Sequence, residues 1–200
     1  MASILILFAH PKLEQSRVNR QLIDRAAAQP GVTVHDLYDR YPDFNVQIDY
    51  EKRLLERHEV ILWQHPFYWY GGPPLLKQWI DLVLEHGWAY GEGGDALLGK
   101  QIMNVITTGG SRAVYCAEGK NNFSVNEFLR PYEQTARLCG MHYLPPFAVM
   151  GTYGLSDGDI AAHADRYADL LGLLREGVGA REIGRCDLIN DLPELQLPPS

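Results

Sequence analysis

The chain has 200 residues, a formal net charge of −7 and 46% hydrophobic residues, as expected of one globular domain with a buried core. The acidic balance and the lack of any Lys/Arg cluster argue against nucleic acid as a partner, because a duplex-binding protein needs a basic face. The apolar runs are too short to span a bilayer, and the scattered Cys116, Cys139 and Cys186 fit a reducing, cytoplasmic compartment.

The first 30 residues predict a strand followed by a helix. Residues 3–9 form a continuous apolar run, which is typical of a central strand buried on both faces of a parallel sheet. Ser16 stands where an N-cap would begin the next helix. Apolar residues at helical spacing predict the buried face of this helix, namely Val18, Leu22 and Ala26.

The next segments repeat the alternation of strand and helix. Residues 32–37 alternate apolar and polar side chains, so they predict a second strand nearer an edge of the sheet. Residues 38–49 contain Pro42 and predict an ordered loop. A short helix over residues 51–57 then leads into a third strand over residues 59–64.

A further helix and a fourth strand follow. Pro73 and Pro74 suit the first turn of a helix, where a missing N–H costs nothing. A loop over residues 87–99 precedes a strand over 102–107, and a second loop covers 108–122. The helix has apolar residues at a helical period, which are Leu75, Leu76, Trp79, Ile80 and Val83.

The last part of the chain predicts two helices and a fifth strand. The first helix is either kinked at Pro131 or begins there. The strand is expected over residues 147–153, and Ser156 begins the final helix, whose periodicity is lost from about Glu176. The apolar residues of the helix around Pro131 are Phe128, Leu129, Tyr132, Ala136 and Cys139.

This order of elements indicates the α/β class. Right-handed crossovers favour a flavodoxin-like, doubly wound, five-stranded parallel sheet of order 2-1-3-4-5 with helices on both faces. We expect one domain over residues 1–176, and a carboxyl-terminal tail over residues 177–200 that lies on this subunit or on a partner.

In such a sheet, ligands bind beyond the carboxyl ends of the strands, at the switch point between the first and third strands. Three loops are expected to meet there, and they cover residues 10–16, 65–73 and 107–111. The first loop ends at a helix N-terminus, where free N–H groups and the helix dipole favour a phosphate. Ser16 is a further donor, and a plain N-cap is the alternative interpretation.

The second loop carries four consecutive aromatic residues. Loops lie at the surface, so core packing alone does not account for these rings. A planar ring system stacked on them would account for their presence, and a subunit interface is the alternative, because aromatic residues are enriched there too. The four residues are Phe67, Tyr68, Trp69 and Tyr70.

The third loop has the sequence TTGG over residues 107–110. Glycine lets backbone N–H groups approach a ligand closely. Such donors beside N1 and O2 of a flavin would stabilise its anionic reduced form, and a plain turn is the alternative.

Two other patterns are not interpreted as sites. Residues 94–100 imitate a phosphate-binding loop, but they precede a strand, and Gln101 stands where Ser or Thr would ligate magnesium. His10 and His65 end neighbouring strands, yet no Cys or carboxylate stands at a supporting spacing. We therefore expect these histidines to form hydrogen bonds, and we predict no metal site.

Several blocks of sequence together resemble the flavodoxin-like NAD(P)H:quinone oxidoreductases. A narrower resemblance, to the ancillary flavoproteins of glutathione-gated potassium efflux systems, rests on LYDRYPDF at residues 37–44 and GWAYG at 87–91. The resemblance covers residues 3–175 and leaves out the tail. The blocks of the wider family are FAHP at 8–11, WQHPFYWY at 63–70, PPLLKQWID at 73–81 and TTGG at 107–110.

This resemblance implies a flavin site and a homodimer. In the family, the segment that matches Trp88 and Tyr90 helps to wall the substrate pocket of the neighbouring subunit. The positions that match the family's flavin contacts are His10, Ser16, Arg17, Val18, Asn19, Phe67, Tyr68, Trp69, Tyr70, Thr107, Thr108, Gly109 and Gly110.

The candidate catalytic residues are Tyr115 and Asn121. Tyr115 matches a tyrosine of the mammalian quinone reductases that hydrogen-bonds the reduced flavin or the quinone. Those enzymes have a histidine six residues later as a proton partner, where this chain has Asn121. Asparagine forms hydrogen bonds but does not relay a proton at neutral pH, so the proton must come from Tyr115, from water or from elsewhere.

The resemblance implies a two-electron, ping-pong hydride transfer from NAD(P)H to a quinone or a similar small electrophile. We expect FMN as the cofactor, with FAD as the alternative, because no loop offers an obvious groove for an adenosine half. The choice between NADPH and NADH stays open.

Two other functions are considered. In the first, the chain binds and activates a membrane potassium efflux transporter, and is cytoplasmic or peripheral at the inner membrane through that protein partner. In the second, it is a one-electron carrier like the flavodoxins. The carrier is less favoured because flavodoxins have a Thr/Ser-rich phosphate loop after the first strand, where this chain has His10 and Pro11.

Overall fold

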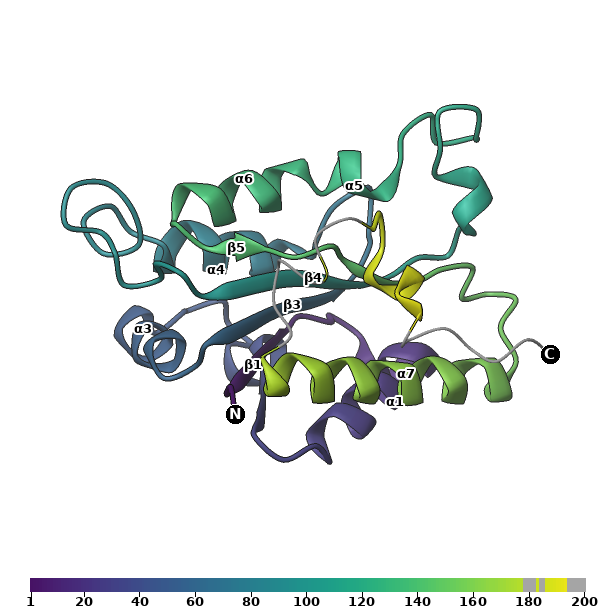
Figure 1. Cartoon of the computed structure of the whole chain (residues 1–200), viewed down its shortest axis with the longest axis horizontal. Helices are drawn as coiled ribbons and strands as arrows, with labels where there is room; N and C mark the ends of the chain where they lie inside the picture. Colours follow the sequence, from purple (N-terminus) through teal and green to yellow (C-terminus); the bar gives the residue numbers. More distant parts are fainter. Residues whose placement is uncertain (178–182, 184–185, 194–200) are drawn as a thin grey trace.

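A parallel sheet between two layers of helices forms the body of the molecule (Figure 1), seen in a computed structural model that describes residues 1–177, 183 and 186–193. The strands are β1 (Ile4–Phe8), β2 (Val32–Asp36), β3 (Val60–Pro66), β4 (Gln101–Thr107), β5 (His142–Tyr143) and β6 (Phe147–Val149). Their order is β2-β1-β3-β4-β5, and β6 pairs with β4 as well. The predicted class and strand order are therefore confirmed.

The expected fifth strand is two short strands. β5 pairs with the start of β4 and β6 with its end, since Gln101 lies opposite His142 and Thr107 opposite Val149. Pro145 and Pro146 separate the two because proline has no N–H to give to a strand ladder. β6 begins at Phe147, as predicted, but it ends at Val149, so the prediction of a strand over residues 147–153 is wrong at its carboxyl end. β5 was not predicted.

Alternate side chains of the central strands supply the two cores. Ile4, Ile6 and Phe8 of β1 pack under α1 (Arg17–Ala27) and α7 (Asp157–Glu176). Leu5 and Leu7 face the opposite layer. That layer contains α3 (Ile48–Glu56), α4 (Pro74–Val83) and α6 (Arg130–Leu138). A strand that is buried on both faces reads as a continuous apolar run, as predicted for the first strand.

Capping residues fix where the helices begin. The Ser16 Oγ accepts the N–H of Asn19 at 3.2 Å, and Ser156 forms a capping box with Asp159 at the start of α7. Pro74 is the first residue of α4, as expected. The first turn of α1 therefore lies at the carboxyl end of β1, and its N–H groups point away from the helix along its axis.

Two predicted segments differ from the structure. The expected loop over residues 38–49 begins with a helical turn, α2 (Leu37–Arg40), because the Asp36 carboxylate accepts the N–H groups of Tyr38 and Asp39. It ends early because α3 starts at Ile48. The expected single helix around Pro131 is divided into α5 (Val125–Phe128) and α6, and the proline lies in the first turn of α6.

Candidate functional site

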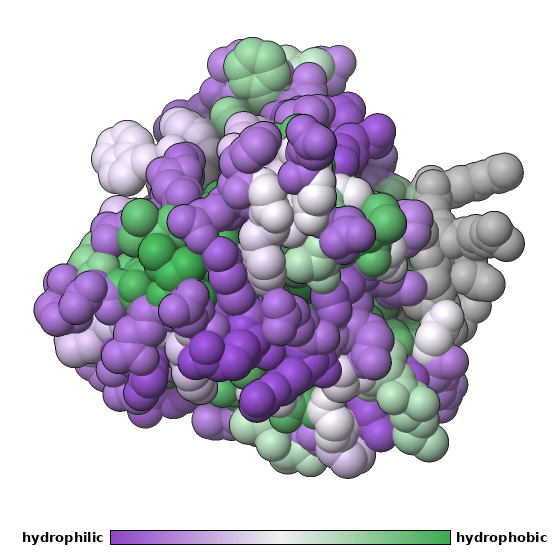
Figure 2. Space-filling model, turned by 90° about the vertical axis from the view of Figure 1, so that its left-hand side faces the viewer, coloured by the Kyte–Doolittle hydropathy of each residue, from purple (hydrophilic) through white to green (hydrophobic). Residues whose placement is uncertain are grey.

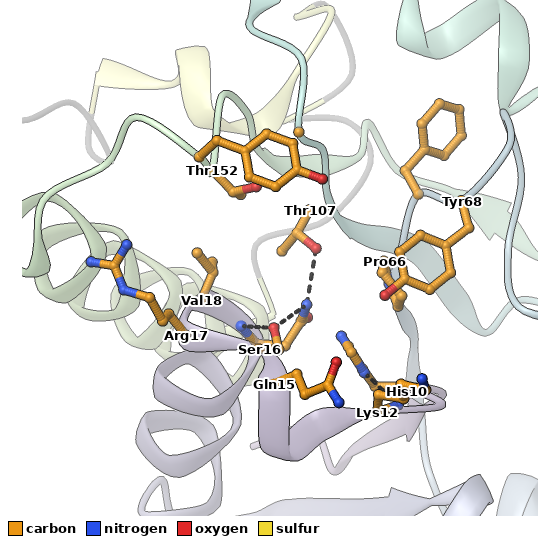
Figure 3. A pocket seen from close by; sticks show the side chains of 14 residues that line it. His10, Lys12, Gln15, Ser16, Arg17, Val18, Pro66, Tyr68, Thr107 and Thr152 are labelled. Carbon is orange, nitrogen blue, oxygen red and sulfur yellow. Dashed lines mark hydrogen bonds between the residues drawn. The ribbon is translucent and has the colours of Figure 1, made fainter.

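A cavity of about 410 Å³ lies at the carboxyl edge of the sheet, where the loops after β1, β3 and β4 meet (Figure 3). Thr152 and Tyr153, in the loop after β6, line it as well. The described lining residues are His10, Lys12, Gln15, Ser16, Arg17, Val18, Asn19, Pro66, Phe67, Tyr68, Thr107, Gly109, Thr152 and Tyr153.

Asn19 joins the start of α1 to the end of β4. Its Nδ2 donates to Thr107 Oγ1 at 2.9 Å and to Ser16 Oγ at 3.3 Å, and both bonds are drawn in Figure 3. Each hydroxyl oxygen therefore accepts from Asn19, and the hydroxyl hydrogens of Ser16 and Thr107 stay available to a ligand. Two loops that are 88 residues apart are fixed at one end of the cavity.

This end of the cavity suits an anion that also carries hydroxyl groups. The first turn of α1 contains no acidic residue, and none of the described lining residues is Asp or Glu. The helix N-terminus adds free N–H groups and its positive dipole end. The buried Asn19 Oδ1 has no hydrogen-bond partner among the described residues, so it is an acceptor that a ligand hydroxyl would satisfy.

Arg17 lies at the edge of the cavity. Its guanidinium donates to Asp157 at 2.6 Å and to the carbonyl oxygen of Leu155 at 3.3 Å. In Figure 3 the side chain extends from α1 toward α7. Arg17 thus offers its backbone N–H and its positive charge at the rim, while the guanidinium is held by the start of α7.

His10 is a neutral donor at the cavity wall. Burial lowers the pKa of its imidazole. Nδ1 accepts the N–H of Lys12 at 3.1 Å, so the neutral ring carries its proton on Nε2. That Nε2–H is a donor for an uncharged or anionic ligand atom.

His65, in contrast, lies beneath the cavity wall and is fully buried. Its Nδ1 donates to the Pro66 carbonyl oxygen at 3.0 Å, and its Nε2 accepts from Asn104 at 3.1 Å. Tyr143 donates to the Asn104 Oδ1 at 2.7 Å. His10, two residues after β1, and His65, near the end of β3, therefore form separate hydrogen bonds, as the sequence predicts.

The four aromatic residues after β3 form a tight turn. Tyr68 and Gly71 exchange two backbone hydrogen bonds, and Trp69 and Tyr70 between them have φ values of 47° and 65°. Such a turn normally holds Asn and Gly, because positive φ is strained for large side chains. In this turn Trp69 points outward and is 93% exposed, and Tyr70 stacks on Phe128 with 4.9 Å between ring centroids.

A second hollow of about 450 Å³ lies beside this turn and includes five further candidates, which are Trp69, Tyr70, Gly110, Tyr115 and Asn121. Tyr70 approaches Asn121 Oδ1 at 3.5 Å. Burial raises the pKa of Tyr115, so its phenol keeps its proton at neutral pH. The lining residues are Phe67, Trp69, Tyr70, Gly110, Val114, Tyr115, Lys120 and Asn121.

Phe67 lies between the two hollows and lines both. Thr108 lines neither, because its N–H donates to Val149 and its hydroxyl to the Gly110 carbonyl oxygen at 2.6 Å. A Cβ at the neighbouring Gly109 would lie 2.4 Å from the Tyr153 ring, so a larger residue there would require this exposed ring to move. Of the predicted TTGG donors, Thr107 and Gly109 face the first hollow and Gly110 faces the second.

Trp88 and Tyr90 are at the opposite end of the sheet. They belong to the loop that precedes β4, whereas the cavity lies where the strands end. The Trp88 Nε1 donates to Glu56 at 3.2 Å and its ring is covered by Lys52. Figure 2 views this end of the molecule, which is largely hydrophilic with a hydrophobic area on one side. Within one chain, these two residues do not reach the cavity.

Five residues that line the first cavity were not predicted as site residues. Thr152 and Tyr153 were expected within the fifth strand, and their place in a loop follows from the end of β6 at Val149. The early end of β6 has no clear local signal apart from Gly151, which has a φ of 71°. The other three lie within the predicted loops and are Lys12, Gln15 and Pro66.

The family model described as "Flavodoxin-like fold" matches residues 2–171. The chain belongs to this flavodoxin-like family. Its strand order and the cavity at the carboxyl edge of the sheet agree with that assignment.

Several known proteins are similar to this chain. The glutathione-regulated potassium-efflux system ancillary protein KefG of Salmonella paratyphi B is 45% identical over 170 residues, which are 85% of this chain and 93% of KefG. General stress protein 14 of Treponema denticola, solved in complex with FMN, is 40% identical with a TM-score of 0.83, covering 86% and 99% of the two chains. An NADPH-quinone reductase from P. pentosaceus is 30% identical with a TM-score of 0.77, covering 84% and 96%.

In the described part of this flavodoxin-like chain, none of the helices has the length and apolar character needed to cross a membrane.

Proposed function

We propose that this protein is an FMN-dependent oxidoreductase that passes electrons from NAD(P)H to a quinone or a similar small electrophile. The observation that carries the proposal is one cavity with an anion-binding end at α1 and an aromatic wall at Phe67 and Tyr68. The FMN complex of the Treponema denticola protein, and the name of the quinone reductase from P. pentosaceus, support it.

The residues at the α1 end fit the phosphate and the sugar-alcohol chain of FMN. The hydroxyls of Ser16 and Thr107 and the N–H groups of the first turn would hold the phosphate, and Asn19 Oδ1 would accept from a hydroxyl. When bound, FMN supplies two-electron redox chemistry. The protein binds and orients it, with His10, Tyr68 and Gly109 along the wall.

In this proposal Tyr115 and Asn121 contact the electron acceptor. The raised pKa of Tyr115 keeps its hydroxyl a hydrogen-bond donor, suited to the oxygen of a quinone. Asn121 is held near Tyr70 and offers an amide, which positions an acceptor without moving a proton. The proton that a quinone takes up then comes from water or from Tyr115.

Cofactor analysis and steady-state kinetics test this function. Flavin released from the purified protein is identified by chromatography, which separates FMN from FAD. Oxidation of NADPH and NADH is then followed with a panel of quinones, and parallel lines in double-reciprocal plots are expected for a ping-pong order. Protein that contains FMN yet oxidises neither nucleotide with any quinone would contradict the proposal.

A second function is favoured by the 45% identity to KefG across 93% of that protein. In this role the chain binds a membrane potassium efflux transporter and activates it, and lies at the inner membrane only through that partner. Co-purification with a transporter and potassium efflux from cells are the measurements. Tyr115→Phe separates the two roles, because it is expected to slow quinone reduction while sparing efflux if activation depends on binding alone.

We propose a homodimer, which the family resemblance implies and with which the positions of Trp88 and Tyr90 agree. Because these residues lie far from the cavity of their own chain, a role in a pocket requires a second copy. We propose that they complete the acceptor pocket of the partner subunit.

A further inference from the structure

The described carboxyl-terminal residues 186–193 lie beyond the part of the chain that matches the family, and they pack on the sheet of their own chain (Figure 1). The 3-10 turn η3 (Ile189–Asp191) sits beside the edge strand β6. The N–H of Ile189 donates to the Pro146 carbonyl oxygen at 3.0 Å, and Asn190 Oδ1 accepts the N–H of Ala148 at 2.8 Å. The segment thus satisfies part of an exposed strand edge.

Two apolar side chains anchor this segment. Ile189 is fully buried in the core beneath α7. Leu188 is 6% exposed and belongs to the cluster that contains Phe67, against which Tyr115 also packs. The segment therefore contributes to the packing around both hollows of the candidate site.

Polar contacts join the segment to the polypeptide around Tyr115. Arg112 donates to both carboxylate oxygens of Asp191, at 2.6 and 2.9 Å. Asn126 donates to the carbonyl oxygen of Asp187 at 2.7 Å. A two-point contact between a guanidinium and a carboxylate fixes direction as well as distance.

Arg112 is directly connected to the Tyr115 ring. It begins the 3-10 turn η2 (Arg112–Val114), and the N–H of Tyr115 donates to its carbonyl oxygen at 3.1 Å. The Tyr115 ring meets Phe67 edge-on, with 5.9 Å between centroids. A displacement of η2 would therefore move the phenol relative to the aromatic wall.

We propose that residues 186–193, here called the strap, position Tyr115 through the ion pair of Arg112 with Asp191. The inference rests on the proposed function, in which Tyr115 contacts the electron acceptor. Arg112 and Asp191 are positioning residues, because they act through η2 and do not line either hollow. The strap lies outside the part of the chain that matches the family. It would therefore influence which electron acceptor is reduced through residues that the family model does not include.

Amide hydrogen exchange of the flavin-free protein tests the strap independently of any activity. The variants are Asp191→Asn, Arg112→Gln and the exchanged pair Arg112→Asp with Asp191→Arg. The control is Asp165→Asn, which breaks the ion pair of Arg25 with Asp165 (2.7 Å) between α1 and α7. Residues 111–122 should exchange several-fold faster in both single variants, at the wild-type rate in the control, and near it in the exchanged pair.

Kinetics of the FMN-loaded variants complete the test. We expect kcat/KM for the quinone to fall roughly three- to tenfold in the single variants and to recover in the exchanged pair, with the FMN Kd unchanged. Unchanged exchange over residues 111–122, failure of the exchanged pair to recover, or unchanged quinone kinetics would each overturn the proposal. If the wild-type protein reduces no quinone, the proposed function fails, and the exchange data alone then show whether the strap holds this segment.

Discussion

His65 shows how a polar side chain can support a site without lining it. It is fully buried, and its two ring nitrogens bridge the Pro66 backbone and Asn104. The Pro66 carbonyl group immediately precedes Phe67, so this bridge fixes the point where β3 leaves the sheet. Its neutral form is required, because a protonated ring would present a second donor to the Asn104 amide.

Burial makes His65 a source of acid sensitivity. The pKa of its imidazole falls from 6.5 to about 4 in the fold. Between these pH values the unfolded chain binds a proton that the folded chain does not, so the free energy of unfolding falls as pH drops from 6.5 to 4, by about 3 kcal/mol. Below pH 4 both states are protonated and this loss is complete.

Urea denaturation at several pH values measures this effect. His65→Gln should lower stability at pH 7 and should flatten the pH dependence between pH 4 and 6.5 relative to the wild type. His10 and His163, whose pKa values are also lowered by burial, remain in both proteins and cancel in the difference. Parallel stability curves for the two proteins would show that His65 is not the source.

At the scale of elements, the turn between Tyr68 and Gly71 carries stored strain. Trp69 adopts a positive φ with 93% of its surface exposed, so it gains little from packing. Asparagine tolerates this conformation better than tryptophan does.

We therefore expect Trp69→Asn to raise the free energy of unfolding by about 0.5–1 kcal/mol and to lower quinone kcat/KM, because Trp69 lines the second hollow. Thermal denaturation and quinone kinetics are the measurements. Tyr153→Asn is the matched control, since Tyr153 is equally exposed but is not among the residues with positive φ. A stability gain in both variants, or in neither, would contradict the strain interpretation.

This turn also marks a limit of sequence analysis. Continuous apolar runs such as Ile4–Phe8 and caps such as Ser16 are local signals, and they predicted the first four strands, the first helix and the three loops of the site. Two aromatic residues at positive φ contradict local preference, so their conformation depends on the surrounding packing. The break between β5 and β6 had a local signal in Pro145 and Pro146. The position of Thr152 and Tyr153 in a loop did not, because it depends on where the pairing of β6 with β4 ends.

Contacts between segments far apart in the sequence could not be predicted from such local signals. The Asn19 bridge to Thr107 and the ion pair of Arg112 with Asp191 join positions 88 and 79 residues apart. Neither pair has a spacing pattern that periodicity or capping rules detect. The residues of the cavity could thus be predicted as loops, whereas their hydrogen-bond partners could not.

At the scale of the whole molecule, the proposal requires two chains for each complete acceptor pocket. Trp88 lies at one end of the sheet and the cavity at the other. A chain with a defective cavity can therefore still supply Trp88 to its partner, and a chain without Trp88 can still supply an intact cavity. Mixing a Trp88→Ala chain with a Ser16→Asp chain should form dimers in which one of the two pockets is complete.

We expect each variant to be nearly inactive alone when FMN is kept too low to fill the Ser16→Asp chain. Under that condition, random mixing of the two variants should restore quinone reduction to about a quarter of the wild-type rate per chain. Sedimentation confirms the dimer, and mixing for different times follows the exchange of subunits. A dimer that regains no activity on mixing would place Trp88 outside the partner's pocket.

The central claim is that the α1 end of the cavity binds the phosphate of FMN. Titration of the flavin-free protein with FMN and with riboflavin, which lacks the phosphate, tests this claim most directly. Ser16→Asp keeps an N-cap but places a carboxylate beside the phosphate, whereas Ser124→Asp makes the same change at the start of α5, away from the cavity. We predict one FMN per chain, at least about tenfold weaker FMN binding in Ser16→Asp, and little change for riboflavin or for Ser124→Asp. Equal loss of both flavins, or FMN binding that Ser16→Asp leaves unchanged, would contradict the account.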